Sequence, residues 1–240
     1  MTAIERVEEL PTSLASSRRR MWAEIAEGLG YVFRHPLMRP MMLWVATSNF
    51  FTTTVFSILL VFAVRVLHLS AATIGLIFSL GSLGTLAGAL AATRIARRFG
   101  IGWTLIGSAA AGGFAFLLIP LASGSLAIPL LVIAQLVFGF SALVGNITGI
   151  SLVQAITPDR LLGRMNASRR FVVWGVIPLG GLAGGALGSH LGLRETMWIG
   201  AAGSSFAFLW VLFSPTRHVV EIDDAEEMVR EINAEFALGA

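Results

Sequence analysis

Apolar residues along the chain gather into six long runs, which short polar segments separate from one another. A helix needs about 20 apolar residues to cross the roughly 30 Å hydrocarbon core of a bilayer. The runs have about this length, and the last is the shortest. We therefore expect an all-α integral membrane protein with six transmembrane helices, over Met41–Val64, Thr73–Ala92, Trp103–Leu121, Ile128–Val153, Phe171–Leu191 and Met197–Phe213.

The composition of the chain supports lipid as its solvent. Hydrophobic residues make up 55% of the sequence and charged residues 13%, whereas a typical soluble domain has about 25% charged residues. No Asp or Glu occurs between Glu27 and Asp159, which excludes an ordinary water-facing surface over more than half of the chain. The chain has no cysteine, so disulfides and thiol chemistry are excluded.

Arginine supplies all 17 basic residues, and its distribution predicts the orientation of the helices. Basic residues beside membrane helices are more frequent on the cytoplasmic side. One side of the predicted bundle has only Arg65 and Arg194, and the other has Arg18, Arg19, Arg20, Arg34, Arg39, Arg94, Arg97, Arg98, Arg160, Arg164, Arg169 and Arg170. We therefore expect both termini in the cytoplasm. The net charge of +3 gives no indication of nucleic-acid binding.

An internal repeat relates the second predicted helix to the fifth. The sequence Leu-Gly-Thr-Leu-Ala-Gly over 83–88 matches Leu-Gly-Gly-Leu-Ala-Gly over 179–184, and the same shift pairs Gly107-Ser108 with Gly203-Ser204. These two helices cross the membrane in opposite directions, so the match predicts an inverted repeat of three helices plus three. Glycines four residues apart let helices approach closely, and we favour packing within the bundle over a dimer interface.

The repeat divides the chain into four predicted parts. Residues 1–36 form a cytoplasmic linker with an amphipathic helix over Met21–Phe33, which is either interfacial or an ordinary linker helix. Residues 37–121 and 122–213 form the two three-helix repeats. Residues 214–240 form an acidic cytoplasmic tail with a short helix, because its apolar residues lie on one helical stripe.

Three segments carry a resemblance to a known family. They are Gly-Tyr-Val-Phe-Arg-His-Pro-Leu over 30–37, the run 88–100 with its three arginines, and Thr-Pro-Asp-Arg-Leu-Leu-Gly-Arg-Met-Asn-Ala over 157–167. Together they resemble the C-terminal half of a major facilitator superfamily (MFS) transporter, in the bacterial branch of macrolide-efflux and enterobactin-exporter proteins. The run 88–100 resembles the second copy of the family's Gly/Arg loop, without its acidic residue.

The resemblance implies a function and a partner. It implies efflux of small lipophilic or drug-like molecules by alternating access, in a bacterial-type cytoplasmic membrane. The family's transporters have twelve helices, so we expect a truncated or split half. This half would pair with a separate N-terminal six-helix half or with a second copy of itself.

Polar and aromatic residues within the predicted helices are candidates for the substrate path, because such groups are rare in lipid and need partners. They are Asn49, Phe50, Thr53, Gln135 and Asn146, with Phe56 and Gln154 as weaker candidates. For Thr53 and Gln154, hydrogen bonding between helices is an equally good interpretation. Candidates for gating are Arg94, Arg97, Arg98, Arg164, Asn166 and Arg169. The first three also fit topology determinants or contacts to anionic lipid. The last three would latch their segment to a neighbouring helix, or else belong to a solvated basic loop.

Residue types that are absent limit the chemistry. No predicted helix contains Asp, Glu, Lys or a central His, so this half offers no proton carrier and suits lipophilic substrates. An alternative is the membrane domain of an ATP-driven exporter, although the chain has no Lys for a Walker motif. We expect no enzyme, cofactor or metal site, because Ser141 and His190 do not form a nucleophile–base pair.

Overall fold

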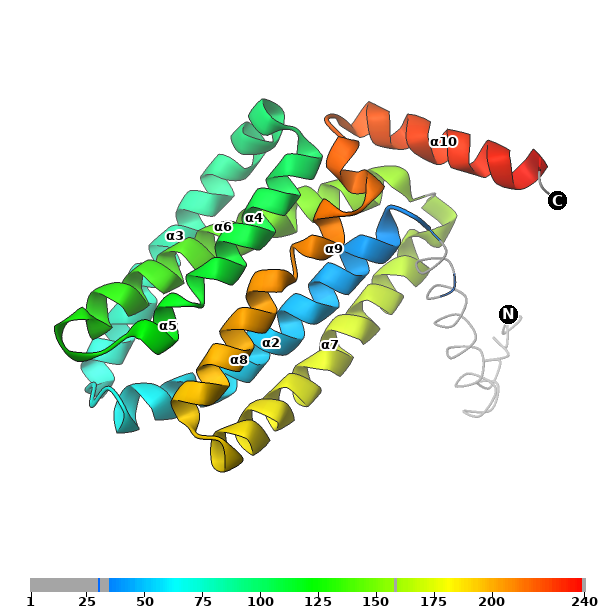
Figure 1. The fold of residues 1–240 in the computed structure, drawn as a ribbon. Helices are drawn as coiled ribbons and strands as arrows, with labels where there is room; N and C mark the ends of the chain where they lie inside the picture. Colours follow the sequence, from blue (N-terminus) through cyan, green and yellow to red (C-terminus); the bar gives the residue numbers. More distant parts are fainter. Residues whose placement is uncertain (1–29, 31–34, 158, 239–240) are drawn as a thin grey trace, which may run out of the picture.

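A computed structural model describes residue 30, residues 35–157 and residues 159–238, and all regular elements in these ranges are helical (Figure 1). Most of the predicted amphipathic helix over Met21–Phe33 lies outside the described residues. The α-helices are α2 Met38–Arg65, α3 Ala71–Phe99, α4 Ile101–Ala115, α5 Leu118–Leu121, α6 Ala127–Ile156, α7 Asp159–His190, α8 Leu193–Phe206, α9 Leu209–Leu212 and α10 Ile222–Leu238. Two 3₁₀ turns are η1 Gly124–Leu126 and η2 Pro215–His218.

Five helical segments are long and apolar enough to cross a membrane, and they match the first five predicted helices. They are Met38–Arg65, Ala71–Phe99, Ile101–Leu121, Gly124–Ile156 and Met165–His190. The sixth predicted helix is not among them. Its residues form α8, which has 14 residues and carries Arg194 and Glu195 in its first turn, and the four-residue α9.

The break between α8 and α9 has a counterpart between α4 and α5. Phe116 N donates to Gly113 O and Ala207 N donates to Ser204 O, each at 3.2 Å, so both helices tighten by one residue at these points. The two helices cross there, since a Cβ on Gly113 would lie 2.5 Å from Ser204 O. Ser205 Oγ lies 3.1 Å from Gly113 O. Both breaks therefore follow directly after the crossing.

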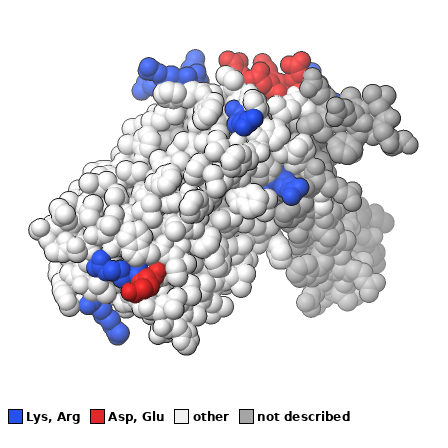
Figure 2. Space-filling view, viewed as in Figure 1, with Lys and Arg blue, Asp and Glu red and all other residues white. Residues whose placement is uncertain are grey.

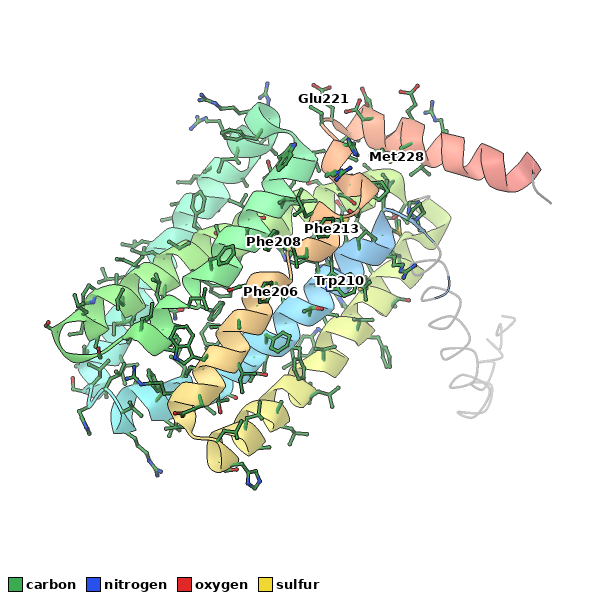
Figure 3. All side chains as sticks on the ribbon, viewed as in Figure 1. Phe206, Phe208, Trp210, Phe213, Glu221 and Met228 are labelled. Carbon is green, nitrogen blue, oxygen red and sulfur yellow. The ribbon has the colours of Figure 1, made fainter. Side chains whose placement is uncertain are left out.

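Aromatic side chains hold the segment around α9 against the bundle (Figure 3). The ring of Phe208 lies 5.9 Å from that of Phe114 on α4, between centroids. The indole nitrogen of Trp210 donates to Thr47 Oγ1 of α2 at 3.2 Å. The segment after the break is therefore packed on α2 and α4 although it is not a long helix.

The packing of the helices is crossed between the two predicted repeats. The second and third helical segments of the first repeat, α3 and α4, both pack on α6 of the second. Conversely, α7 and α8 of the second repeat pack on α2 of the first. The repeated glycines lie at these contacts: Gly84 and Gly88 touch the backbone of Leu136 and Phe140, and Gly180 and Gly184 touch that of Phe50 and Thr54.

The beginnings of α4 and α8 also correspond. Gly100 and Gly192 precede these helices with φ of 81° and 106°, a backbone conformation that favours glycine. Thr104 and Thr196, each four residues later, donate from Oγ1 to the carbonyl of the preceding glycine. The equivalent positions are 92 residues apart here, whereas the glycines of α3 and α7 are 96 apart. The glycines that the sequence pairs at 107 and 203 have different neighbours: a Cβ on Gly107 would meet no atom within 4 Å, and the ring of Phe51 lies against Gly203.

One end of the bundle carries Arg94, Arg97 and Arg98, and we call it the arginine-rich end. The connections between helices at this end are shorter than predicted. Gly100 is the only residue between α3 and α4, so Arg94, Arg97 and Arg98 lie on the last turns of α3 and not in a loop. Arg164, Asn166 and Arg169 likewise lie within α7, which begins at Asp159. The apolar runs in the sequence are shorter than the helices that contain them. The predicted helices therefore ended too early for α3, at Ala92, and began too late for α7, at Phe171.

The C-terminal segment returns to the arginine-rich end and covers the start of α4. Ile101 N donates to Val220 O at 3.1 Å, and Gly102 N donates to Val219 O at 2.8 Å. These bonds satisfy two of the backbone donors that a helix N-terminus leaves free. Asp224 Oδ2 accepts from the backbone N–H groups of Val220 and Glu221 and so begins α10.

Candidate functional site

A cavity of about 330 Å³ lies between α2, α4, α6 and α7. Its wall is mainly apolar and includes Trp44, Val45, Ala109 and Ile150. Small residues of α4 and α6, such as Gly112 and Gly145, make room for it because they carry no side chain beyond Cα. The cavity has the size and apolar character of a small-molecule site.

Two of the predicted substrate-path residues, Asn49 and Asn146, line this cavity from facing helices. Asn49 is half-buried and its Nδ2 donates to Val45 O at 2.7 Å, which leaves its amide oxygen free of that bond. Asn146 is exposed at the cavity wall. The structure therefore places an amide on α2 and an amide on α6 beside the same space.

The other predicted path residues lie elsewhere. The backbone of Phe50 and the side chain of Thr53 contact Gly180 of α7. Gln135 is buried where Gly81 of α3 packs on α6. Gln154 is exposed outside the cavity wall. We find these three polar side chains on helix contacts or on the outer surface.

Hydroxyl groups on the cavity wall were not among the candidates from the sequence. Ser48, Thr52, Ser108, Ser141 and Ser204 line it. Ser108 Oγ donates to Leu105 O at 3.0 Å, whereas Ser204 Oγ is buried with no hydrogen-bond partner among the described residues. Small hydroxyl residues are common throughout membrane helices, so the sequence held no signal that separated these from the rest.

Different side chains surround the two ends of the cavity. At the arginine-rich end, Met38, Met41, Met42 and Met165 belong both to the cavity wall and to a buried cluster that includes Ala225 of α10. At the opposite end, Phe116 and Phe138 line the cavity with their ring centroids 4.8 Å apart, and Phe56 packs on both. Methionine is flexible and adapts to irregular contacts, whereas the ring cluster is rigid.

Arg169 is the only charged side chain on the cavity wall within the part of the chain that the structure describes. It is half-buried on α7, one turn from Met165. Asn166 is exposed on the same helix, and the side chain of Arg164 lies outside the described set. Of the predicted gating residues of α7, the structure brings only Arg169 to the cavity.

The charged side chains in view lie toward the two ends of the molecule, and the surface between them is almost free of charge (Figure 2). Arg94, Arg97 and Arg98 are exposed at the end of α3, away from the cavity wall. At the opposite end, Arg194 donates to Pro120 O at 2.6 Å and to Ala122 O at 3.2 Å, and its guanidinium lies 5.5 Å from the Phe62 ring centroid. Arg194 thereby joins α8 to α5 and α2.

The described residues contain no group of three His, Asp or Glu side chains placed to hold a metal ion. Comparison with known proteins gives one positive result: the model of the Major Facilitator Superfamily matches residues 10–237. Searches of curated proteins and of solved structures find no match. The family match spans nearly the whole chain and agrees with its long apolar helices. The chain belongs to the major facilitator superfamily, whose members are membrane transporters and not enzymes.

Proposed function

We propose that the chain forms one six-helix half of an MFS transporter that exports small lipophilic molecules by alternating access. The observation that carries this proposal is the cavity, whose wall is mainly apolar with two amides, several hydroxyls and the half-buried Arg169. A few polar groups on an apolar wall fix the orientation of a ligand that is otherwise lipophilic.

The crossed packing supports an inverted three-plus-three repeat. Gly84 and Gly88 meet α6 in the way that Gly180 and Gly184 meet α2, and the breaks after α4 and α8 share one crossing. On this basis α8 and α9 together make the sixth crossing. The domain division is then a linker over 1–36, repeats over 37–121 and 122–213, and a tail over 214–240.

The arginine-rich end faces the cytoplasm in this proposal, in the cytoplasmic membrane of a bacterial-type cell. Arg94, Arg97, Arg98 and Arg169 lie toward that end, with the tail helix α10 beside them, whereas Arg65 and Arg194 lie toward the other. Such a difference is typical of the cytoplasmic side of membrane proteins.

A second set of six helices supplies the other wall of the transport path, from a separate half or from a second copy of the chain. Asn146 and Ala142 are exposed although they line the cavity, so one side of the cavity is open. The cavity wall contains no carboxylate among the described residues, so any proton carrier lies on the other half.

The short connections argue against the membrane domain of an ATP-driven exporter. Such helices extend far into the cytoplasm to reach the nucleotide-binding domain, whereas here α3 and α4 are joined by Gly100 alone. The connection between α6 and α7 is also short, because α6 ends at Ile156 and α7 begins at Asp159.

The test is efflux of a lipophilic fluorescent dye from efflux-deficient bacteria that express the chain alone or with a second six-helix half. Ala142→Trp puts a large side chain at the open side of the cavity, where Ala142 is exposed and no buried neighbour must move. The matched control is Ala89→Trp, at an exposed position of α3 outside the cavity. We expect Ala142→Trp to abolish dye efflux and Ala89→Trp to retain it. No efflux from the wild type in either setting, or equal efflux from both variants, contradicts the proposal.

A further inference from the structure

A second hollow, which we call the lateral groove, lies on the outside of the bundle between α3, α4 and α6. Its volume is about 730 Å³. Ile95 and Phe99 form the α3 wall, Trp103 and Gly107 the α4 wall, and Phe140 of α6 is part of its floor. Helices α3 and α4 both pack closely on α6 but have little contact with each other, which leaves the groove open between them.

The lateral groove offers apolar surface and few polar groups. The hydroxyls of Thr104 and Ser108 line it, but they donate within their own helix to Gly100 O and Leu105 O. A Cβ added to Gly107 would meet no atom within 4 Å, so the α4 wall has free space beside it. The buried Ser141 adds a third hydroxyl to the wall. An unbranched hydrocarbon chain satisfies such a surface, whereas a polar ligand finds few partners there.

The groove opens at the end of α3 that carries three arginines. Phe99 and Trp103 stand at this opening with 60% and 58% of their surface exposed. The Arg98 guanidinium lies 5.8 Å from the Phe99 ring centroid. Arg94, Arg97 and Arg98 are exposed, and none of them has an ion pair with another described residue. The opening therefore combines unpaired positive charge with an interfacial tryptophan, which is typical of the depth of lipid headgroups.

From residue 103 to residue 111 the groove follows α4 inward for about 12 Å, at the rise of an α-helix. The positive charge lies at the surface end, and the apolar wall continues toward the bilayer centre. A phospholipid has the same order of chemistry: a negative phosphate at the surface and an acyl chain directed inward.

We propose that the lateral groove binds one acyl chain of an anionic phospholipid, whose phosphate lies beside Arg98, while Arg94 and Arg97 add to the positive charge at the same end of α3. The arginines select the anionic headgroup, and the apolar walls hold the chain. The site lies on the outside of the bundle, where Ser108 and Ser141 separate it from the transport cavity that they also line. The inference does not depend on the direction of transport.

The experiment compares retention of phosphatidylglycerol and phosphatidylcholine, with identical acyl chains, by the purified full-length chain in detergent, measured by native mass spectrometry. Each arginine near a membrane surface contributes about 1 kcal/mol toward an anionic lipid, so we expect at least about a tenfold preference for phosphatidylglycerol. Glycerol phosphate, which has the headgroup charge without acyl chains, should not displace the lipid.

Three variants separate the parts of the site. Replacing Arg94, Arg97 and Arg98 together by Gln should remove the headgroup preference and leave some binding of both lipids. Gly107→Leu should fill the groove and reduce retention of both lipids. The matched control is Gly185→Leu on α7, where a Cβ would also meet no atom within 4 Å and which lies outside the groove.

The outcomes decide the proposal in either direction. Equal retention of the two lipids by the wild type, or an unchanged preference in the triple Gln variant, overturns it. Retention that Gly107→Leu does not reduce overturns it as well, because the lipid would then bind only through surface charge. Thermal unfolding midpoints of all variants, compared with the wild type, establish that each one is folded.

Discussion

The contact between α3 and α6 at Gly84 leads to a sharp test of the packing. A Cβ at position 84 would lie 2.8 Å from Leu136 Cα and from its carbonyl carbon. Both atoms belong to the backbone, so no side-chain rotation relieves the clash. Gly84→Ala must push α3 away from α6 along their whole contact, and we expect it to destabilise the protein.

The magnitude follows from the difference between this glycine and an unobstructed one. Overpacking of a close contact costs about 1–3 kcal/mol, and a Gly→Ala change in a helix with free space gains up to about 1 kcal/mol. Gly75 is on the same helix and has no atom within 4 Å of an added Cβ. We expect Gly84→Ala to be less stable than Gly75→Ala by about 2–3 kcal/mol.

The assay is thermal unfolding of the purified protein in detergent, followed by the fluorescence of its six tryptophans. The expected difference corresponds to a midpoint about 5–10 °C lower for Gly84→Ala than for Gly75→Ala. Gly180→Ala should show a similar loss, because its Cβ would lie 2.5 Å from Phe50 O on α2. Its control is Gly185→Ala, where space is open.

Equal midpoints for Gly84→Ala and Gly75→Ala would refute the close approach of α3 to α6. A loss at Gly180 without one at Gly84 would refute the equivalence of the two crossed contacts, and would leave only the packing of α7 on α2 as described. The pair of experiments therefore tests the geometry and the repeat separately.

Three further predictions concern other parts of the molecule. Arg194→Ala should lower the unfolding midpoint, because two charged hydrogen bonds are lost. Each such bond contributes about 1.5–3 kcal/mol when buried, and less when solvent reaches it. The exposed Arg65→Ala should change the midpoint little, and equal losses would contradict the role of Arg194. The chain has no cysteine, so single cysteines can report its orientation. An impermeant maleimide added to intact cells should label Ser125→Cys, and should label Glu221→Cys only after the cells are opened. The reverse pattern would contradict the proposed orientation in the membrane. Burial lowers the pKa of His35 below 6.5. Its contribution to stability is therefore present above pH 6.5 and is lost as the pH falls through the lowered pKa. Between about pH 7.5 and pH 5 the wild type should lose more stability than His35→Gln, and equal losses would contradict this.

The sequence was sufficient for the five long apolar segments. It showed neither the break between α4 and α5 nor the one between α8 and α9, because both follow the crossing of the two helices at Gly113 and Ser204. Nothing in the local sequence of Ser204 or Ala207 requires a tight turn. The partner helix, far away in sequence, determines it.

Among the candidate path residues, Gln135 and Asn146 show why polarity alone does not locate a cavity. They are eleven residues apart on α6 and therefore lie on nearly the same face, about 16 Å apart along the axis. Helix α3 approaches Gln135 through Gly81 and buries it, whereas no helix covers Asn146. The glycines of α3 were visible in the sequence, but their partner on α6 was not.

The carbonyls of Val219 and Val220, which accept hydrogen bonds from Gly102 and Ile101, have a consequence for the biosynthesis of the protein. Ile101 and Val220 are 119 residues apart. While the ribosome synthesises that stretch, the first turn of α4 must rely on water or headgroups for these donors. The last stage of synthesis then closes this helix end, so the membrane-inserted intermediate differs from the finished fold at the arginine-rich end until the tail emerges.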